Sequence, residues 1–541
     1  MTLRTLLLCL LTVACGESHG PAVRAAGASG CAPGAGPLDL SGSVAEADAK
    51  TYQMIPFEVA PGTGRVEISY QWTERPGLPA TPLTSTTLDL GLWDEKGYRN
   101  PAGFRGWGGS RQGRLDQDKP PVFVQADSAD RGFNPGPVYP GTWYAELGIA
   151  AVSPQGADWL LRIECKPAGG SRPAADPVDQ DHVARDAPGW YHGDFHMHGY
   201  HSNPNGPTAE DFIAQARAAK LDFLMVTEYV TGRHWQELGA MQRVNPDLLI
   251  WPGREVITYF GHVNVHGETP GFYEYRHGFE DVDIGLIQRE AKAGGALFQV
   301  NHPTIWPPPL FSNFCRGCYF ELGEAIDWDR VDTIEILTGP VLTTTTELGL
   351  PGLPLAIENP FLQTALDLWD DLLTDGHKIT AVSGSDSKGV DPPEERARKG
   401  YGSSATAVYA ENLSRPALKR AIQAGHAYVR TRGAAGSPAL EFAVTAANGR
   451  QGTFGDSLTV TPDESVRLRT TVTGAAGQLL SFSANGSVQA VVPILSDPFV
   501  DEREVQRQPG SEGPLGTFWR VETRDLQSRT AIGNPVFLRG P

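Results

Sequence analysis

The stretch TAEDFIAQARAAKLDFLMVTE, residues 208–228, joins a helix pattern directly to a strand pattern. Thr208, followed by an acid three residues later, is a helix-capping signature, and the residues up to Lys220 favour a helix. The run LDFLMVTE that follows predicts a strand. The same helix–strand order returns in residues 284–301, 361–386 and 415–431. Repeated units of this kind predict a mainly parallel α/β sheet, either open or closed into a barrel.

The chain on either side of this region has a different pattern. Alternating apolar residues such as Val66, Ile68 and Tyr70 predict a β-sandwich before it, and strand patterns return after it. A length of 541 residues is also too great for one hydrophobic core. We therefore expect a signal peptide and tether at 1–37, an N-terminal β-sandwich domain at 38–168, a linker at 169–188, an α/β domain at 189–435 and a small C-terminal β domain at 436–541.

The first residues have the form of an export signal. Arg4 precedes an apolar run from Leu6 to Ala14 that is too short to span a bilayer, and Cys15 follows small residues as in a bacterial lipoprotein cleavage box. We expect an exported protein, either anchored through a lipid on Cys15 at the bacterial cell envelope or released as a periplasmic or secreted protein. The net charge of -18 argues against nucleic acid and anionic membranes as partners, so membrane contact is expected only through Cys15.

The other cysteines fit an oxidising compartment. Cys31 and Cys165 bracket one segment and are candidates for a disulfide that joins its ends. Cys315 and Cys318 form a CRGC motif, which suits a tight disulfide, a redox pair or half of a zinc site. A second CxxC motif is missing from the sequence, so we favour the local disulfide.

Histidines and acids gather just past the ends of predicted strands. Three of the 13 histidines lie within GDFHMHGYHSN, residues 193–203. The strand-end residues are His196, His198, Glu255, His262, His302 and Asp386. Because active sites of parallel α/β folds form at the C-terminal ends of strands, these side chains are expected to converge. Four imidazoles and two carboxylates are enough for two divalent cations that share a bridging carboxylate.

Five motifs in this order also resemble a known family. They are GDFHMH (193–198), LDFLMVTEY (221–229), WPGREVITYFGHVN (251–264), FQVNHP (298–303) and AVSGSDSK (381–388). They are similar to the PHP (polymerase and histidinol phosphatase) domain, and the Glu–Gly-His spacing and the NPVF ending resemble its CehA/McbA-type branch. The resemblance implies a distorted seven-stranded β/α barrel, here flanked by two small β-sandwich-like domains. It also implies a cluster of two or three zinc, manganese or iron ions, and hydrolysis of an ester by a metal-bound hydroxide.

The resemblance assigns roles to individual residues. It implies a first metal site of His196, His198, Glu255 and Asp386, with Glu255 bridging to a second metal at His262 and His302. His266 is a rival ligand for the second metal, although we favour an exposed strand residue there.

The chain departs from the family at its third metal site. Tyr229, Lys388 and Asn203 stand where the family usually has metal ligands. We therefore expect two metal ions, with the Lys388 ammonium in place of the third and Tyr229 as a hydrogen-bond donor to substrate. The alternative is that Lys388 only pairs with Glu228.

Three further residues are candidates for the pocket. His201 is a candidate proton shuttle or substrate contact, and Arg233 and His234 are candidates for its mouth.

The sequence thus predicts a metal-dependent hydrolase acting on a small-molecule phosphomonoester or phosphodiester. A carboxyl ester, carbamate or amide is the alternative substrate class on the same site. Two further readings remain open: a degenerate PHP-like binding protein, and metal ions with a purely structural role. The sequence leaves the oligomeric state undetermined.

Overall fold

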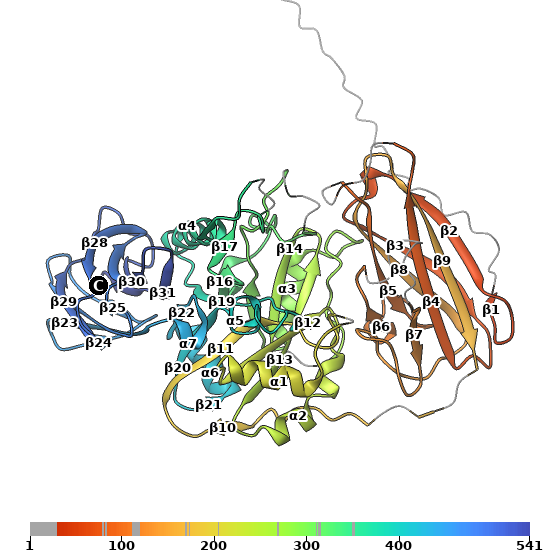
Figure 1. Ribbon diagram of the computed structural model, residues 1–541, viewed down its shortest axis with the longest axis horizontal. Helices are drawn as coiled ribbons and strands as arrows, with labels where there is room; N and C mark the ends of the chain where they lie inside the picture. Colours follow the sequence, from red (N-terminus) through yellow and green to blue (C-terminus); the bar gives the residue numbers. More distant parts are fainter. Residues whose placement is uncertain are drawn as a thin grey trace, which may run out of the picture.

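A computed structural model describes residues 30–541 apart from 78–80, 82–83, 111–119, 168–169, 172–173, 204, 268–269, 310, 312–314 and 349–351. The predicted cleavage region and Cys15 lie outside the described residues. Figure 1 shows an N-terminal β region in red to orange, a central α/β region in yellow to cyan and a C-terminal β region in blue. Across the described residues, no helix combines the length and the apolar character needed to cross a membrane.

The N-terminal region consists of two sheets around one buried cluster. The first sheet contains β1 (Gly30–Cys31), β3 (Thr51–Val59), β8 (Gly141–Ala151), β5 (Thr87–Trp93) and β6 (Phe104–Trp107) in that spatial order. The second contains β2 (Leu38–Val44), β9 (Ala157–Lys166), β4 (Arg65–Glu74) and β7 (Val122–Gln125). Alternate residues of these strands face the shared core, as period-2 patterning requires. A disulfide between Cys31 and Cys165, with Cα atoms 5.4 Å apart, joins the two sheets.

The central region confirms the helix–strand repeats. Thr208 caps α1 (Ala209–Ala218) by accepting a hydrogen bond from the Asp211 backbone N–H at 3.2 Å. The other central helices are α2 (Gly239–Val244), α3 (Ile284–Ala293), α4 (Pro360–Asp375), α5 (Arg396–Lys399), α6 (Arg415–Ala424) and α7 (Gly433–Gly436). Short 3₁₀ helices lie at Glu46–Asp48, Pro101–Gly103, Arg233–Gln236 and Trp328–Arg330.

The central strands belong to one mixed sheet. They are, in spatial order, β19 (Thr380–Gly384), β16 (Thr333–Thr338), β15 (Leu297–Val300), β14 (Gly261–His266), β13 (Leu249–Thr258), β12 (Phe223–Tyr229), β11 (Gly189–Met197), β20 (Ala405–Ala410) and β22 (Ala427–Arg430). Two short pairs lie outside it: β10 (Val183–Arg185) with β21 (Leu413–Ser414), and β17 (Leu342–Thr344) with β18 (Ala356–Glu358).

The sheet is less parallel than the repeats predict. Strands β11, β12 and β13 are parallel, and so are β15, β16 and β19, but β14 runs antiparallel to both of its neighbours. The reason is a two-residue turn at Tyr259–Phe260, which folds β14 straight back along β13 instead of allowing a crossover. The architecture is therefore mixed α/β and rich in strands, and the seven-stranded barrel stays a prediction.

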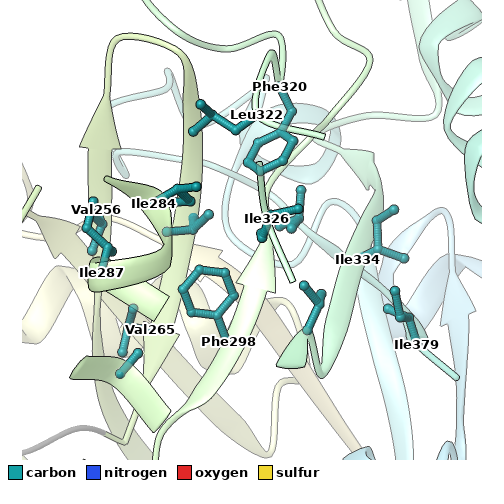
Figure 2. Close-up of a cluster of buried hydrophobic side chains, with 14 of the residues drawn as sticks. Val256, Val265, Ile284, Ile287, Phe298, Phe320, Leu322, Ile326, Ile334 and Ile379 are labelled. Carbon is teal, nitrogen blue, oxygen red and sulfur yellow. The ribbon is translucent and has the colours of Figure 1, made fainter. Parts of the chain in front are cut away.

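One apolar cluster fixes the sheet beneath α3 and α4. Figure 2 shows Ile284 and Ile287 of α3 in one group with Val265 and Phe298 from the neighbouring strands β14 and β15. All four side chains are buried. Core side chains pack at crystal-like density, so this cluster holds α3 against β14 and β15 and keeps the ends of these strands in place.

The C-terminal strands continue the central sheet across the boundary expected at 435/436. Strand β31 (Arg529–Gly533) pairs with β22, and the sheet continues through β30 (Thr517–Arg524), β27 (Leu479–Ala484) and β28 (Ser487–Pro493). Strands β25 (Ser457–Thr459) and β32 (Val536–Arg539) pair beside β30. A further sheet contains β24 (Gln451–Gly452), β23 (Ala439–Ala446), β26 (Val466–Thr473) and β29 (Phe499–Val505).

Candidate metal centre

The structure brings four of the predicted ligands into one buried group. His196 lies in β11, His198 directly after it, Glu255 in β13 and Asp386 just past β19. The Nε2 atom of His198 is 3.2 Å from Glu255 Oε2 and 2.9 Å from Asp386 Oδ1. The Nε2 atom of His196 is 3.3 Å and 3.5 Å from the same two oxygens. Their ligand atoms all lie within 4.8 Å of one another, a spacing that one metal ion can span.

A second pair of imidazoles faces the other oxygen of Glu255. His262 Nδ1 is 3.1 Å from Glu255 Oε1, and His302 Nε2 is 3.8 Å from it. His262 stands at the start of β14, and an antiparallel strand begins where its predecessor ends, so this histidine still reaches the C-terminal edge of β13. Glu255 therefore presents Oε2 to one pair of histidines and Oε1 to the other.

Buried donor and acceptor atoms face one another in this group. His196 Nε2 and His198 Nε2 lie 3.3 Å and 3.2 Å from Glu255 Oε2, yet none of these three atoms makes a well-aligned hydrogen bond within the described chain. A metal ion between them would satisfy all three at once. Donors of imidazole and carboxylate type suit divalent metal ions. The residues present therefore fit a divalent metal ion.

The backbone at two of these positions is unusual. His302 has φ of 30° and Asp386 has φ of 50°, in the left-handed region that residues other than glycine seldom adopt. Each follows a short buried strand, β15 or β19, and the turn swings its side chain toward Glu255. Strained backbone of this kind persists where the surrounding structure holds a functional side chain in place.

The charges in the group are mutually dependent. Burial alone would raise the pKa of Glu255 and of Asp386, but neighbouring imidazoles and the Lys388 ammonium lower both pKa values well below their usual range. Burial opposes the charged form of His196, yet Glu335, Glu255 and Asp386 raise its pKa well above the usual range. The carboxylates thus favour positive charge at this site, which protons on the imidazoles or bound metal ions would supply.

Glu335 was missed by the sequence analysis. It lies in β16 with no exposed surface, and its Oε2 accepts from His196 Nδ1 at 3.1 Å and from the His302 backbone N–H at 3.1 Å. A carboxylate behind a ligating imidazole fixes the ring and its tautomer. A Cβ at Gly384 would lie 2.4 Å from His196 Cβ and 2.9 Å from Glu335 Oε1, so glycine is needed for this approach. The only sequence signal was an acid inside the apolar strand TIEILT.

Replacing Glu335 with glutamine is expected to weaken metal binding about 10- to 100-fold, because the amide cannot hold the imidazolyl N–H as a carboxylate does. Competition with a chromogenic chelator measures this affinity. Glu321→Gln is the matched control, since Glu321 pairs with Lys50 at the surface. Equal affinities in the two variants would show that Glu335 does not position His196.

The His198 ring is also held in place by a hydrogen bond with a serine that the sequence analysis did not identify. Its Nδ1 lies 3.1 Å from Ser202 Oγ, and Ser202 in turn hydrogen-bonds the buried Glu228. Glu228 also accepts from the His201 backbone N–H at 3.1 Å. Both histidines of the His-x-His motif are therefore backed, directly or through a hydroxyl, by a buried carboxylate.

Lys388 pairs with a predicted metal ligand and not with Glu228, so that alternative is wrong. Its Nζ donates to Asp386 Oδ1 at 2.5 Å and to the Asp386 carbonyl at 3.0 Å, and it lies 5.4 Å from the centre of the Tyr229 ring. Burial opposes its charge, but Asp386 raises the pKa of Lys388 far above the usual value. The Tyr229 ring centre lies 4.2 Å from that of His198, with the rings tilted by 35°, and burial raises the pKa of Tyr229, so its hydroxyl stays protonated.

A cavity of about 440 Å³ opens beside this pair. Asp386 and Lys388 line it together with Trp306, Phe361, Lys399 and Asn203. Its wall thus carries two ammonium groups, each paired with a carboxylate of the same wall (Asp386 or Glu347), and two aromatic rings next to the metal-binding group. Asn203 lines it but falls outside the metal-binding groups found in the described chain.

The remaining candidates lie apart from this cavity. His201 Nε2 and Arg233 Nε each bind Glu237 at 2.7 Å, and Arg233 also donates to the carbonyls of Ala129, Asp130 and Phe133. His234 is buried, with Nε2 2.7 Å from the Gly253 carbonyl, and burial lowers its pKa to about 4. His201 and His234 line a separate cavity of about 340 Å³, so their substrate roles stay predictions.

His266 is buried, which corrects the expectation of an exposed residue. Its Nε2 lies 3.2 Å from Gln299 Oε1, and in the described chain it joins no group of metal-ligand type. Four residues separate His262 and His266 along β14, so the two side chains share one face of the sheet, but His266 lies toward the other end of the strand, opposite Gly253. Burial lowers its pKa from 6.5 to about 3.

His266 is therefore expected to make the metal-free protein sensitive to acid. Between pH 6.5 and 3 the unfolded chain binds a proton at this position that the folded chain does not, so stability falls as pH falls. In His266→Gln the loss of unfolding free energy between pH 7 and pH 5 should be smaller by about 2 kcal/mol. Urea denaturation measures it, with the half-buried His377→Gln as control. Parallel pH profiles for parent and variant would contradict the assignment.

Comparison with known proteins gives a likeness among solved structures and no family match. No protein-family model matches the chain, and no curated protein matches it. Among solved structures it is similar to a two-domain protein containing a predicted PHP-like metal-dependent phosphoesterase from Bacteroides vulgatus ATCC 8482. The identity is 16%, the match covers 68% of this chain and 99% of that chain, and the TM-score is 0.35.

Proposed function

We propose that this protein is a hydrolase that uses two divalent metal ions to cleave a phosphoester. One observation carries the proposal: the two oxygens of the buried Glu255 face two separate pairs of imidazoles. A carboxylate in that position would help to hold two metal ions, one through each oxygen. Bound there, such ions would lower the pKa of a shared water molecule and polarise phosphoryl oxygens.

The residues around the metal centre have distinct tasks. His196, His198 and Asp386 would hold the first ion, and His262 and His302 the second. Glu335 and Ser202 orient two of the imidazoles. The Lys388 ammonium stands at the wall of the cavity, where it would bind an anionic oxygen of the substrate and stabilise the charge that develops on it.

The fold and location belong to the same proposal. We assign a PHP-like barrel of the CehA/McbA type to strands β11–β16 and β19. A parallel bridge between Met197 and Ser387 supports closure between the first and last of these strands. The Asp386 backbone N–H also donates to the His196 carbonyl at 2.7 Å. Export, with an anchor on Cys15, fits the disulfide between Cys31 and Cys165.

Elemental analysis and an ester screen test the proposal together. The purified protein should contain about two equivalents of zinc, manganese or iron and should hydrolyse chromogenic phosphomonoesters or phosphodiesters. His196→Ala/His302→Ala should lose both the metal and the activity. His182→Ala/His377→Ala is the control, because these histidines contact Pro246 and Asp329 outside the centre.

Each of three other results would contradict one part of the proposal. Hydrolysis of carboxyl esters, carbamates or amides alone would overturn the phosphoester assignment. Two metal ions without hydrolysis of any ester would indicate a structural centre. Absence of metal after reconstitution would favour the degenerate binding protein.

A further inference from the structure

The loop closed by Cys315 and Cys318 lies directly against the second pair of imidazoles. His262 Nε2 is 2.8 Å from the Arg316 carbonyl, and His302 Nδ1 is 3.0 Å from the Cys318 carbonyl. A carbonyl only accepts hydrogen bonds, so each of these nitrogens carries the proton of its ring. The opposite nitrogens, which face Glu255, are thereby left free to bind a metal ion.

The sulfur of Cys318 lies close to the same two imidazoles. Its Sγ and one nitrogen each of His262 and His302 all lie within 4.8 Å of one another, and the three residues are buried. In the structure this sulfur is bonded to Cys315, which is half-buried. A sulfur in a disulfide is a poor metal ligand, whereas a thiolate is among the strongest for zinc.

Two hydrogen bonds and a close backbone approach hold the loop in this place. Arg316 donates to Asp89 Oδ1 at 3.0 Å and to Ser110 Oγ at 2.9 Å, both in the N-terminal region. Gly317 has φ of 80°, and a Cβ there would lie 2.3 Å from the Thr258 carbonyl. The loop is thus fixed by contacts that do not depend on the disulfide, so Cys318 is expected to stay near the imidazoles after reduction.

We propose that reduction of the Cys315–Cys318 disulfide makes Cys318 a ligand of the second metal ion, beside His262 and His302. This inference rests on the proposed function, because it concerns the second ion of that centre. The disulfide form offers imidazole and carboxylate donors only. The reduced form adds one thiolate and so favours zinc over manganese at this position.

The redox step balances with a dithiol as reductant. A thiolate of the dithiol attacks the more accessible sulfur, that of Cys315, and the bond to Cys318 breaks with the electron pair leaving on Cys318. The second thiol of the reductant then displaces Cys315 as a thiol and closes the oxidised reductant. Two electrons pass to the protein, one proton stays on Cys315 and one passes to solvent as Cys318 binds the metal ion.

Cobalt(II) is a suitable probe because it absorbs strongly in the near ultraviolet only when a thiolate is bound to it. Cys315→Ser leaves Cys318 as a free thiol, and Cys318→Ser is the matched control that leaves Cys315. Each full-length protein is loaded with cobalt(II), as is the parent before and after reduction with dithiothreitol and anaerobic removal of the reductant. We expect the thiolate-to-cobalt band in Cys315→Ser and in the reduced parent. The oxidised parent and Cys318→Ser, with or without reduction, should lack it.

The outcomes separate this inference from the proposed function. Visible cobalt absorption in every protein, with no thiolate band in the reduced parent or in Cys315→Ser, would overturn the role of Cys318 and leave the metal centre intact. A band of equal strength in reduced Cys318→Ser would place the thiolate elsewhere and overturn it too. Failure of all forms to bind cobalt would overturn the metal centre itself. The reduced parent has no substitution, so misfolding of a variant cannot decide the result.

Discussion

Glu255→Gln is expected to abolish the binding of both metal ions and to lower kcat/KM for the best phosphoester by at least about 10³-fold. Both oxygens of Glu255 face imidazoles, so the substitution removes a negative charge from the two sites at once. Metal ions supply several kcal/mol of transition-state stabilisation, and each ~1.4 kcal/mol is about tenfold in rate. Elemental analysis and steady-state kinetics on the same preparation measure the two effects.

The loss of metal can be assigned to Glu255 only if the Glu255→Gln variant keeps its fold. The amide keeps the size of the carboxylate, and Asn301 Nδ2, 3.3 Å from Oε1, keeps an acceptor there. Circular dichroism should therefore match the parent. The control is Glu321→Gln, whose carboxylate pairs with Lys50 at the surface, and it should retain both ions. Full metal content and full activity in Glu255→Gln would refute the bridging role.

Lys388→Met is expected to lower kcat about 10²- to 10³-fold while metal content stays at two ions per chain. The loss is that of one preorganised charge beside the reacting group. Because Asp386 holds the pKa of Lys388 above its usual range, the ammonium is charged throughout the neutral and mildly alkaline range, and the loss should not depend on pH there. The difference in kcat between pH 6 and pH 9 measures this.

A second lysine in the same cavity provides the control. Lys399 lines that cavity but pairs with Glu347 at 2.6 Å, so Lys399→Met should change kcat much less. A third equivalent of metal in Lys388→Met would mean that the ammonium had occupied a metal position, as the sequence comparison with the family predicts. Unchanged kcat with two ions would remove Lys388 from the chemistry and leave it as a partner of Asp386.

Local sequence predicted the helix–strand repeats well, because their signals are local. Thr208 caps α1 through the adjacent backbone, and the strand after it begins with four apolar residues, FLMV. The six ligand-type residues could also be found, since each follows or interrupts a strand, and the structure gathers them. The direction of β14 could not be predicted, because an alternating pattern is the same for a parallel and an antiparallel strand. The two-residue turn at Tyr259–Phe260 makes β14 antiparallel to β13.

What the sequence by itself determined is therefore the set of helices and strands and the kind of donor placed at their ends. The tertiary structure alone decided which side chains contact these donors. It set Glu335 behind His196, and the loop of Cys315 and Cys318 over His262 and His302. The physical reason is that these contacts join residues far apart in the chain. Their distances follow from how the sheet curves and packs, and residue type and spacing carry no record of that.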